Sequence, residues 1–148
     1  MRRIAITLAA SIAAAAAFAL AAPAEPGLES DLTALSGQGT GHVSLSLTAR
    51  ARGETFYAEV QVAVHDARPN TTFTVTRFVD QPPDGVCTEA GGGLVLGTFT
   101  TNEAGAGAFH YVRVSPGETP GFQFDIDFHV VGDDGTLLES GCMTATMK

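Results

Sequence analysis

The sequence predicts an all-β protein, a seven-stranded antiparallel β-sandwich of immunoglobulin-like type with one disulfide. Three observations predict this fold class. Apolar residues recur at every second position from His42 onward, turn-forming residues interrupt this pattern at regular intervals, and two cysteines lie far apart in the second half of the chain. A chain of 148 residues holds one such domain, which we place at residues 42–148.

The N-terminal residues have the organisation of a secretory signal peptide. Two arginines, Arg2 and Arg3, precede an uncharged, alanine-rich run from residue 4 to 22, and small residues at Ala22 and Ala24 form a cleavage site. We therefore expect a signal peptide at residues 1–24 and a location outside the cytoplasm, either secreted or in the periplasm and cell envelope. An uncleaved membrane anchor stays open as the alternative because the run approaches the thickness of a bilayer. After cleavage we expect no stable membrane insertion.

The composition excludes several classes of partner. The chain carries 8 basic against 16 acidic residues, a net charge of −8, whereas nucleic acids and anionic membranes select basic surfaces. Its 45% of hydrophobic residues is too high for a disordered chain. A single lysine, Lys148, together with the alanine-rich leader suggests a bacterial exported protein.

Residues 25–41 mix Gly, Ser, Thr and acidic side chains, and they predict a flexible N-terminal arm. Leu28, Leu32 and Leu35 recur at helical spacing, so one or two helical turns are the alternative. From His42 the period becomes two. A two-residue turn at Arg52-Gly53 pairs Ala49 with Phe56 and Val43 with Val62, which brings every apolar side chain of this first hairpin to one face.

Four further strands follow. A β-branched strand at 71–79 leads into a long Gly- and Pro-containing loop at 80–93, and strands at 94–101 and 107–114 form a second hairpin. Its turn, Asn102 to Gly105, has the residues of a type I turn closed by a left-handed glycine. The strand at 122–131 directs five apolar side chains inward, namely Phe122, Phe124, Ile126, Phe128 and Val130. Asp125 and Asp127 then lie on a solvated outer face.

The last strand, 136–147, contains one of the two cysteines. In an exported protein we expect Cys87 and Cys142 to form a disulfide, which stabilises the fold by about 4 kcal/mol in the chain-entropy model. A two-residue turn at Asp134-Gly135 places Cys142 opposite Asp127 and on the outside, so that the bond ties the 80–93 loop to the exterior. The alternative is a three-residue turn that directs Cys142 into the core.

No motif indicates catalysis, a cofactor or a metal. The four histidines lie on separate strands without the spacing of a ligand pair, and we expect them to be solvated: His42, His65, His110 and His129. No G-x-S-x-G nucleophile motif occurs. Asp125 and Asp127 could serve acid–base chemistry or calcium binding, but their position on the solvent-exposed face of an amphipathic strand accounts for them without either role.

One surface is a candidate for binding a partner. In the second hairpin Phe99 faces Phe109, Gly97 faces Tyr111 and Val95 faces Arg113, while the opposite side is also apolar. Both sides cannot face one core, so one is either covered by another part of the chain or exposed. We predict a partner-binding surface of Val95, Phe99, Phe109, Tyr111 and Arg113, and an extracellular protein or cell-envelope polysaccharide as the partner.

The stretch from Thr72 to Val114, with its cysteine, Gly-rich loop and T-x-x-x-G-x-G turn, resembles exported bacterial immunoglobulin-like modules, including the apoproteins that carry enediyne chromophores. This resemblance covers about a third of the mature chain. Those apoproteins have two disulfides where this chain can form one, so it implies nothing about ligand binding.

Two functions follow as expectations. The first is a secreted, non-catalytic β-sandwich module for binding or a structural role. The second is a small secreted enzyme or ligand carrier with a site at the loop end of the sandwich. A concave apolar cavity with convergent polar groups favours the second, and a filled core with a flat face favours the first.

Overall fold

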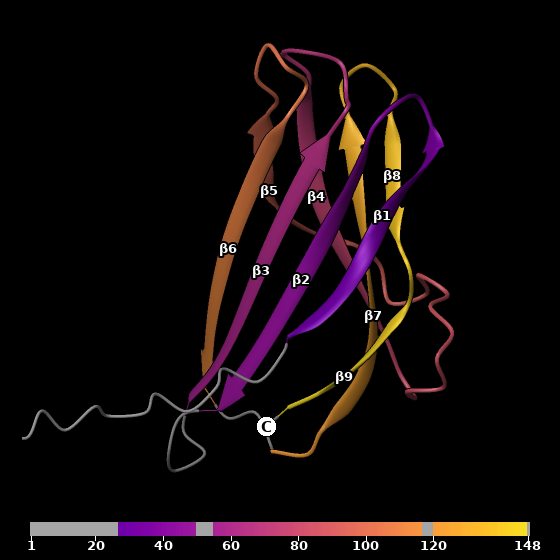
Figure 1. Cartoon of the computed structure of the whole chain (residues 1–148). Coiled ribbons are helices and arrows are strands. Elements are labelled where there is room, and N and C mark those ends of the chain that lie inside the picture. The colour runs from indigo at the N-terminus through magenta and orange to yellow at the C-terminus, as the bar shows by residue number, and fades with distance from the viewer. Residues whose placement is uncertain (1–26, 50–54, 117–119, 148) are drawn as a thin grey trace, which may run out of the picture.

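The computed structural model describes residues 27–49, 55–116 and 120–147, and within these ranges the protein is all-β and antiparallel, without a helix (Figure 1). The predicted signal peptide and the Arg52-Gly53 turn lie outside the described residues. The strands are β1 (Leu28–Ser36), β2 (Thr40–Ala49), β3 (Thr55–His65), β4 (Thr72–Asp80), β5 (Leu94–Thr100), β6 (Gly107–Pro116), β7 (Gln123–Gly132), β8 (Leu137–Ser140) and β9 (Met143–Thr146).

These strands form one nine-stranded sheet that curls into a nearly closed barrel (Figure 1). Its order is β5-β4-β7-β8-β1-β2-β3-β6, and β9 pairs with β7. The expectation of seven strands is wrong, because residues 28–36 add a strand and the predicted strand 136–147 is divided in two. The immunoglobulin-like sandwich is not confirmed, since hydrogen bonding runs continuously from β5 to β6 instead of ending at two separate sheets.

The first hairpin has the register that the sequence predicts. Ala49 pairs with Phe56 and Val43 with Val62, and the register between β2 and β3 is unbroken over their described lengths. Val43 and Val62 are buried, as the alternation of apolar and polar residues requires.

Residues 28–36 are not an arm. They form β1, which pairs with β2 on one side and β8 on the other and so joins the two halves of the sheet. Leu32 is 2% exposed and belongs to the core, whereas Leu35 is 62% exposed on the other face. The helical spacing of the leucines misleads here because only one of them, Leu32, is buried, and the tertiary pairing decides the conformation.

The second hairpin is only partly as expected. Its turn is confirmed: Gly105 adopts a φ of +73°, and its N–H donates to Asn102 O at 3.0 Å. Beyond the turn, however, β5 pairs with β4 and β6 with β3, so β5 and β6 are the two ends of the sheet order and no ladder joins them. The two strands therefore diverge beyond the turn, and each forms its backbone hydrogen bonds with its other neighbour.

Strand β7 forms the centre of the core. Phe124, Ile126, Phe128 and Val130 are buried as predicted, but Phe122 is 39% exposed at the start of the strand.

The outer face of β7 is not solvated at its two aspartates. Asp125 and Asp127 are 0% and 3% exposed. Two backbone N–H groups of the 81–93 loop bond to Asp125, so the expectation of a wet strand face is wrong at these positions.

The disulfide Cys87–Cys142 is confirmed, with the two Cα atoms 5.5 Å apart. Cys142 is exposed, and the bond ties the 81–93 loop to the corner between β8 and β9. Such a bond indicates an oxidising compartment. The described residues contain no helix of the length and hydropathy needed to cross a membrane.

The register beside this bond arises differently from the prediction. Val131 pairs with Leu137, and the N–H of Gly132 donates to Thr136 O at 2.8 Å, so the β7–β8 turn has three residues, 133–135, instead of two. One extra residue between β8 and β9 then restores the expected pairing of Ile126 with Met143. The bulge explains why Cys142 points outward despite the longer turn.

Candidate functional site

A cavity of about 300 Å³ lies at the end of the barrel where β4 and β6 finish and β7 begins. Strand β5 begins at Leu94, which pairs with Arg77, so the last three residues of β4 have no β5 partner on that edge. The sheet therefore stays open between β4 and β6 at this end, and the opening is the mouth of the cavity.

Most of the lining is apolar and comes from the inward side of five strands and the residues beside them. The apolar members are Leu45, Leu47, Phe56, Ala58, Val60, Val79, Phe122, Phe124, Ile126 and Met147. Four polar side chains join them, namely Arg77, Gln81, Tyr111 and Arg113. An apolar concave surface with a few convergent polar groups is typical of a small-molecule site.

Arg77 and Arg113 approach the cavity from β4 and β6, the two strands on either side of the opening. Neither makes an ion pair with a carboxylate of the described residues, whereas Arg68 lies 3.6 Å from Asp134. Burial, and next the like charge of Arg113, lowers the pKa of the Arg77 guanidinium, and Tyr111 opposes this shift. Because guanidinium groups stay protonated in proteins, two positive charges face one apolar cavity in an acidic protein.

The predicted partner-binding residues do not form one surface. Phe99 and Phe109 pack against the edge of the core, with their ring centroids 6.4 Å apart. Tyr111 and Arg113 line the cavity, and Val95 is 60% exposed on the outside. The set divides because the pairing of β5 with β4 shifts by one residue between Gly97 and Val95, which places Val95 on the outer face.

Sequence reasoning missed Arg77. The signal was present in the alternation of β4, because Phe73 and Val75 are buried and the same parity places Arg77 and Val79 on the inward side. An arginine on the inward side of a strand places a charge on a face that is otherwise apolar, and this distinguishes the cavity end of the barrel.

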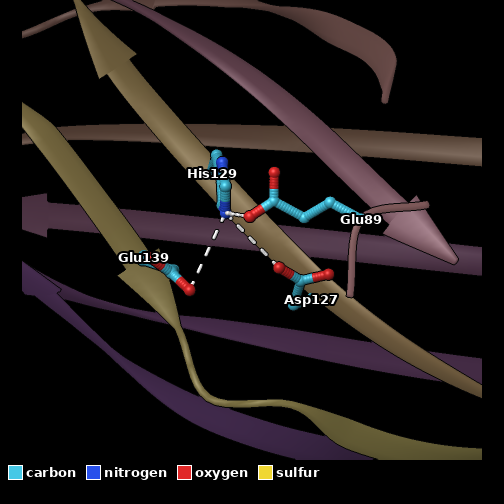
Figure 2. Close-up of side chains that lie close together, drawn as sticks. All are labelled: Glu89, Asp127, His129 and Glu139. Atoms are coloured by element: carbon cyan, nitrogen blue, oxygen red, sulfur yellow. Dashed lines mark ion pairs between the residues drawn. The ribbon is translucent and has the colours of Figure 1, made fainter. Parts of the chain in front are cut away.

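The four histidines also differ from one another. His42, His65 and His110 are exposed, as expected, but the side chain of His129 is only 13% exposed. It lies among carboxylates from β7, β8 and the 81–93 loop (Figure 2). The expectation of a solvated histidine is wrong at this position because the loop covers the outer face of β7.

Neither the protein-family models nor the curated proteins contain a match to this chain. Its function must therefore be inferred from the arrangement of its own side chains.

Proposed function

We propose that the protein is an exported binding protein for a small amphipathic anion. The apolar lining takes the body of the ligand, and Arg77 and Arg113 bind its carboxylate or a similar oxyanion. The observation that carries the proposal is the pair of arginines, without a described ion-pair partner, beside an apolar cavity. Arginine binds carboxylates through two parallel N–H···O bonds, which gives this arrangement both affinity and orientation.

The volume supports a ligand of limited size. A 150 Å³ apolar cavity is sufficient for benzene, so about 300 Å³ holds roughly a dozen non-hydrogen atoms. Decanoate, a ten-carbon carboxylate, has this size and polarity and is the probe that we choose. Decanol is its uncharged counterpart.

The test is isothermal titration calorimetry of the mature, disulfide-bonded protein with both probes. We expect decanoate to bind, and decanol to bind roughly tenfold more weakly or less, because a bond to a charged group contributes about 1.5–3 kcal/mol. Arg77→Gln and Arg113→Gln should each weaken decanoate binding by a similar factor. Arg68→Gln, at an arginine outside the cavity, is the matched control and should bind as the wild type does. Equal affinity for the two probes, or no binding of decanoate, would contradict the proposal.

A catalytic role has no support from the cavity, because its polar side chains are two arginines, a glutamine and a tyrosine, without a carboxylate or histidine to act as a general base. These side chains can bind an anion without converting it, as a carrier or a sensor does.

A second candidate is the binding of an extracellular protein or cell-envelope polysaccharide through the outer side of β5 and β6. Val112 and Val114 lie two residues apart on β6 and are 48% and 56% exposed, and Val95 on β5 is 60% exposed. Exposed apolar side chains such as these favour a contact surface. Val112→Thr with Val114→Thr should abolish such binding and leave decanoate binding unchanged, which separates this candidate from the cavity.

The location outside the cytoplasm and the immunoglobulin-like relationship stay predictions. Mass spectrometry of the protein from culture medium, reporting a new N-terminus after Ala24, would test the first.

A further inference from the structure

Four side chains from three different elements meet on the outer face of β7, away from the cavity (Figure 2). Asp127 and His129 belong to β7, Glu139 to β8 and Glu89 to the 81–93 loop. One donor atom from each lies within 4.8 Å of the others. Figure 2 shows the three carboxylates directed at one atom, Nε2 of His129.

The distances are too long for hydrogen bonds. Nε2 of His129 lies 3.4 Å from Glu89 Oε1, 3.4 Å from Asp127 Oδ2 and 3.8 Å from Glu139 Oε1. The edge of a tetrahedron with metal–ligand bonds of about 2.1 Å measures about 3.4 Å, which is the spacing of donors around a four-coordinate zinc ion. The three separations from Nε2 are thus closer to those of metal ligands than to those of hydrogen-bonded partners, and every pair of the four donor atoms lies within 4.8 Å.

Two buried atoms in this group have no hydrogen-bond partner among the described residues. They are Oδ1 of Asp127, whose side chain is 4% exposed, and Nε2 of His129. Buried polar atoms in folded proteins are almost always satisfied, and a site for an ion is one of the recognised reasons for an exception. A cation among these donors satisfies Nε2 of His129, and it also satisfies Oδ1 of Asp127 when that carboxylate binds it through both oxygens.

The charges also require a counter-ion. Three carboxylates surround a single imidazole, and no arginine of the described residues pairs with any of them. The like charges of Glu89, Asp127 and Glu139 lie close together there and repel one another. A divalent cation would offset this repulsion.

We propose that Glu89, Asp127, His129 and Glu139 form a binding site for one divalent transition-metal ion of the zinc class. The imidazole nitrogen at the meeting point favours zinc over calcium or magnesium, which prefer oxygen ligands throughout. The sequence does not predict this site through a ligand pair at short spacing, because the donors come from a loop and two strands.

The fold positions the ligands in advance. Cys87, two residues before Glu89, is joined to Cys142, and Asp80 accepts hydrogen bonds from the backbone and hydroxyl of Thr88. The ring of Phe78 lies 4.6 Å from that of His129 and restricts its orientation. The ion would therefore join a loop that is already held near β7 to β7 and β8.

The experiment is a Zn²⁺ titration of the mature, disulfide-bonded protein by calorimetry, with native mass spectrometry for the stoichiometry. We expect one Zn²⁺ per chain, and no binding of Ca²⁺ or Mg²⁺ under the same conditions. Glu89→Gln and Glu139→Gln change partly exposed side chains and preserve their size, so the variants should fold. Each should weaken Zn²⁺ binding by roughly tenfold or more. Glu103→Gln, in the exposed β5–β6 turn, is the matched control and should bind as the wild type does.

Two spectroscopic readings separate this site from binding at the exposed histidines. Zn²⁺ should shift the Nε2 resonance of His129 and leave those of His42, His65 and His110 unchanged. Co²⁺ in place of Zn²⁺ should give the intense visible absorption of a tetrahedral site, and Glu89→Gln should remove it. Absence of Zn²⁺ binding, binding unaltered in both glutamine variants, or equal binding of Ca²⁺ would overturn the proposal.

Discussion

Asp125 Oδ2 accepts the backbone N–H of Gly85 at 2.6 Å, so a strand carboxylate holds a loop 40 residues earlier in the chain. The same oxygen accepts the N–H of Asp84 at 2.8 Å, and Thr144 Oγ1 donates to the other oxygen at 2.6 Å. These bonds explain why a carboxylate is fully buried on the face that alternation assigns to solvent.

Asp125→Asn should lower the melting temperature and loosen the loop, because an amide has one acceptor oxygen where the carboxylate has two. Hydrogen exchange measured by NMR should speed up at the amides of Asp84 and Gly85. Asp31→Asn, on the exposed side of β1, is the control and should change neither quantity. Unaltered exchange at Gly85 would show that the disulfide alone holds the loop.

Acid should destabilise the protein through the same group. The hydrogen bond from Thr144 lowers the pKa of Asp125 below its ordinary value of 3.8, burial opposes this, and the loop N–H groups lower it further. The folded state therefore binds fewer protons than the unfolded state, so this contribution to stability is complete above pH 3.8 and is lost as the pH falls through the lower, folded value. Urea unfolding at decreasing pH should show a flatter acid dependence in Asp125→Asn than in the wild type. Parallel curves for the two proteins would contradict this assignment.

Strand β1 provides a direct comparison of two leucines. Leu32→Ala should lower the free energy of unfolding by about 2–5 kcal/mol, because it leaves a cavity in a packed core. Leu35→Ala, at a side chain that is 62% exposed, should stay within about 0.5 kcal/mol of the wild type. Urea denaturation measures both. Equal, small effects would mean that residues 28–36 do not form an integral strand in solution.

The sequence predicts some of these strands well and others poorly, for a physical reason. In β2 and β3 one face packs on the core, so alternation determines which residues are buried and even the pairing of Val43 with Val62. In β7 alternation predicts the buried apolar residues but not the burial of Asp125 and Asp127 on the other face. In β1 only Leu32 is deeply buried, so the pattern is too weak to predict a strand.

The candidate sites depend on contacts between distant segments. The 81–93 loop buries Asp127 and brings Glu89 to His129, and nothing in the local sequence around either residue records this contact. The position of Arg77 was accessible to sequence reasoning, because the parity of β4 directs it inward. The cavity beside it was not, because it results from the divergence of β5 and β6.

Removal of the disulfide should affect both stability and the proposed metal site. Cys87→Ser combined with Cys142→Ser should lower the free energy of unfolding by up to about 4 kcal/mol, the chain-entropy value for a loop of this length. The double variant should also bind Zn²⁺ more weakly, because Glu89 lies two residues from Cys87. Urea unfolding with and without reductant is the measurement, and only the wild type should respond to the reductant. A double variant as stable as the wild type would show that the loop closes without the bond.

Binding of an amphipathic anion at the open end of the barrel can be measured residue by residue with methyl NMR during a decanoate titration. We predict saturable shifts at Leu45, Val60 and Ile126, which line the cavity, and none at Val64 and Val75, which are buried elsewhere in the core. Decanol at equal concentration should produce smaller shifts. Shifts confined to Val112 and Val114 on the outer face, or no saturable shift at all, would contradict the claim.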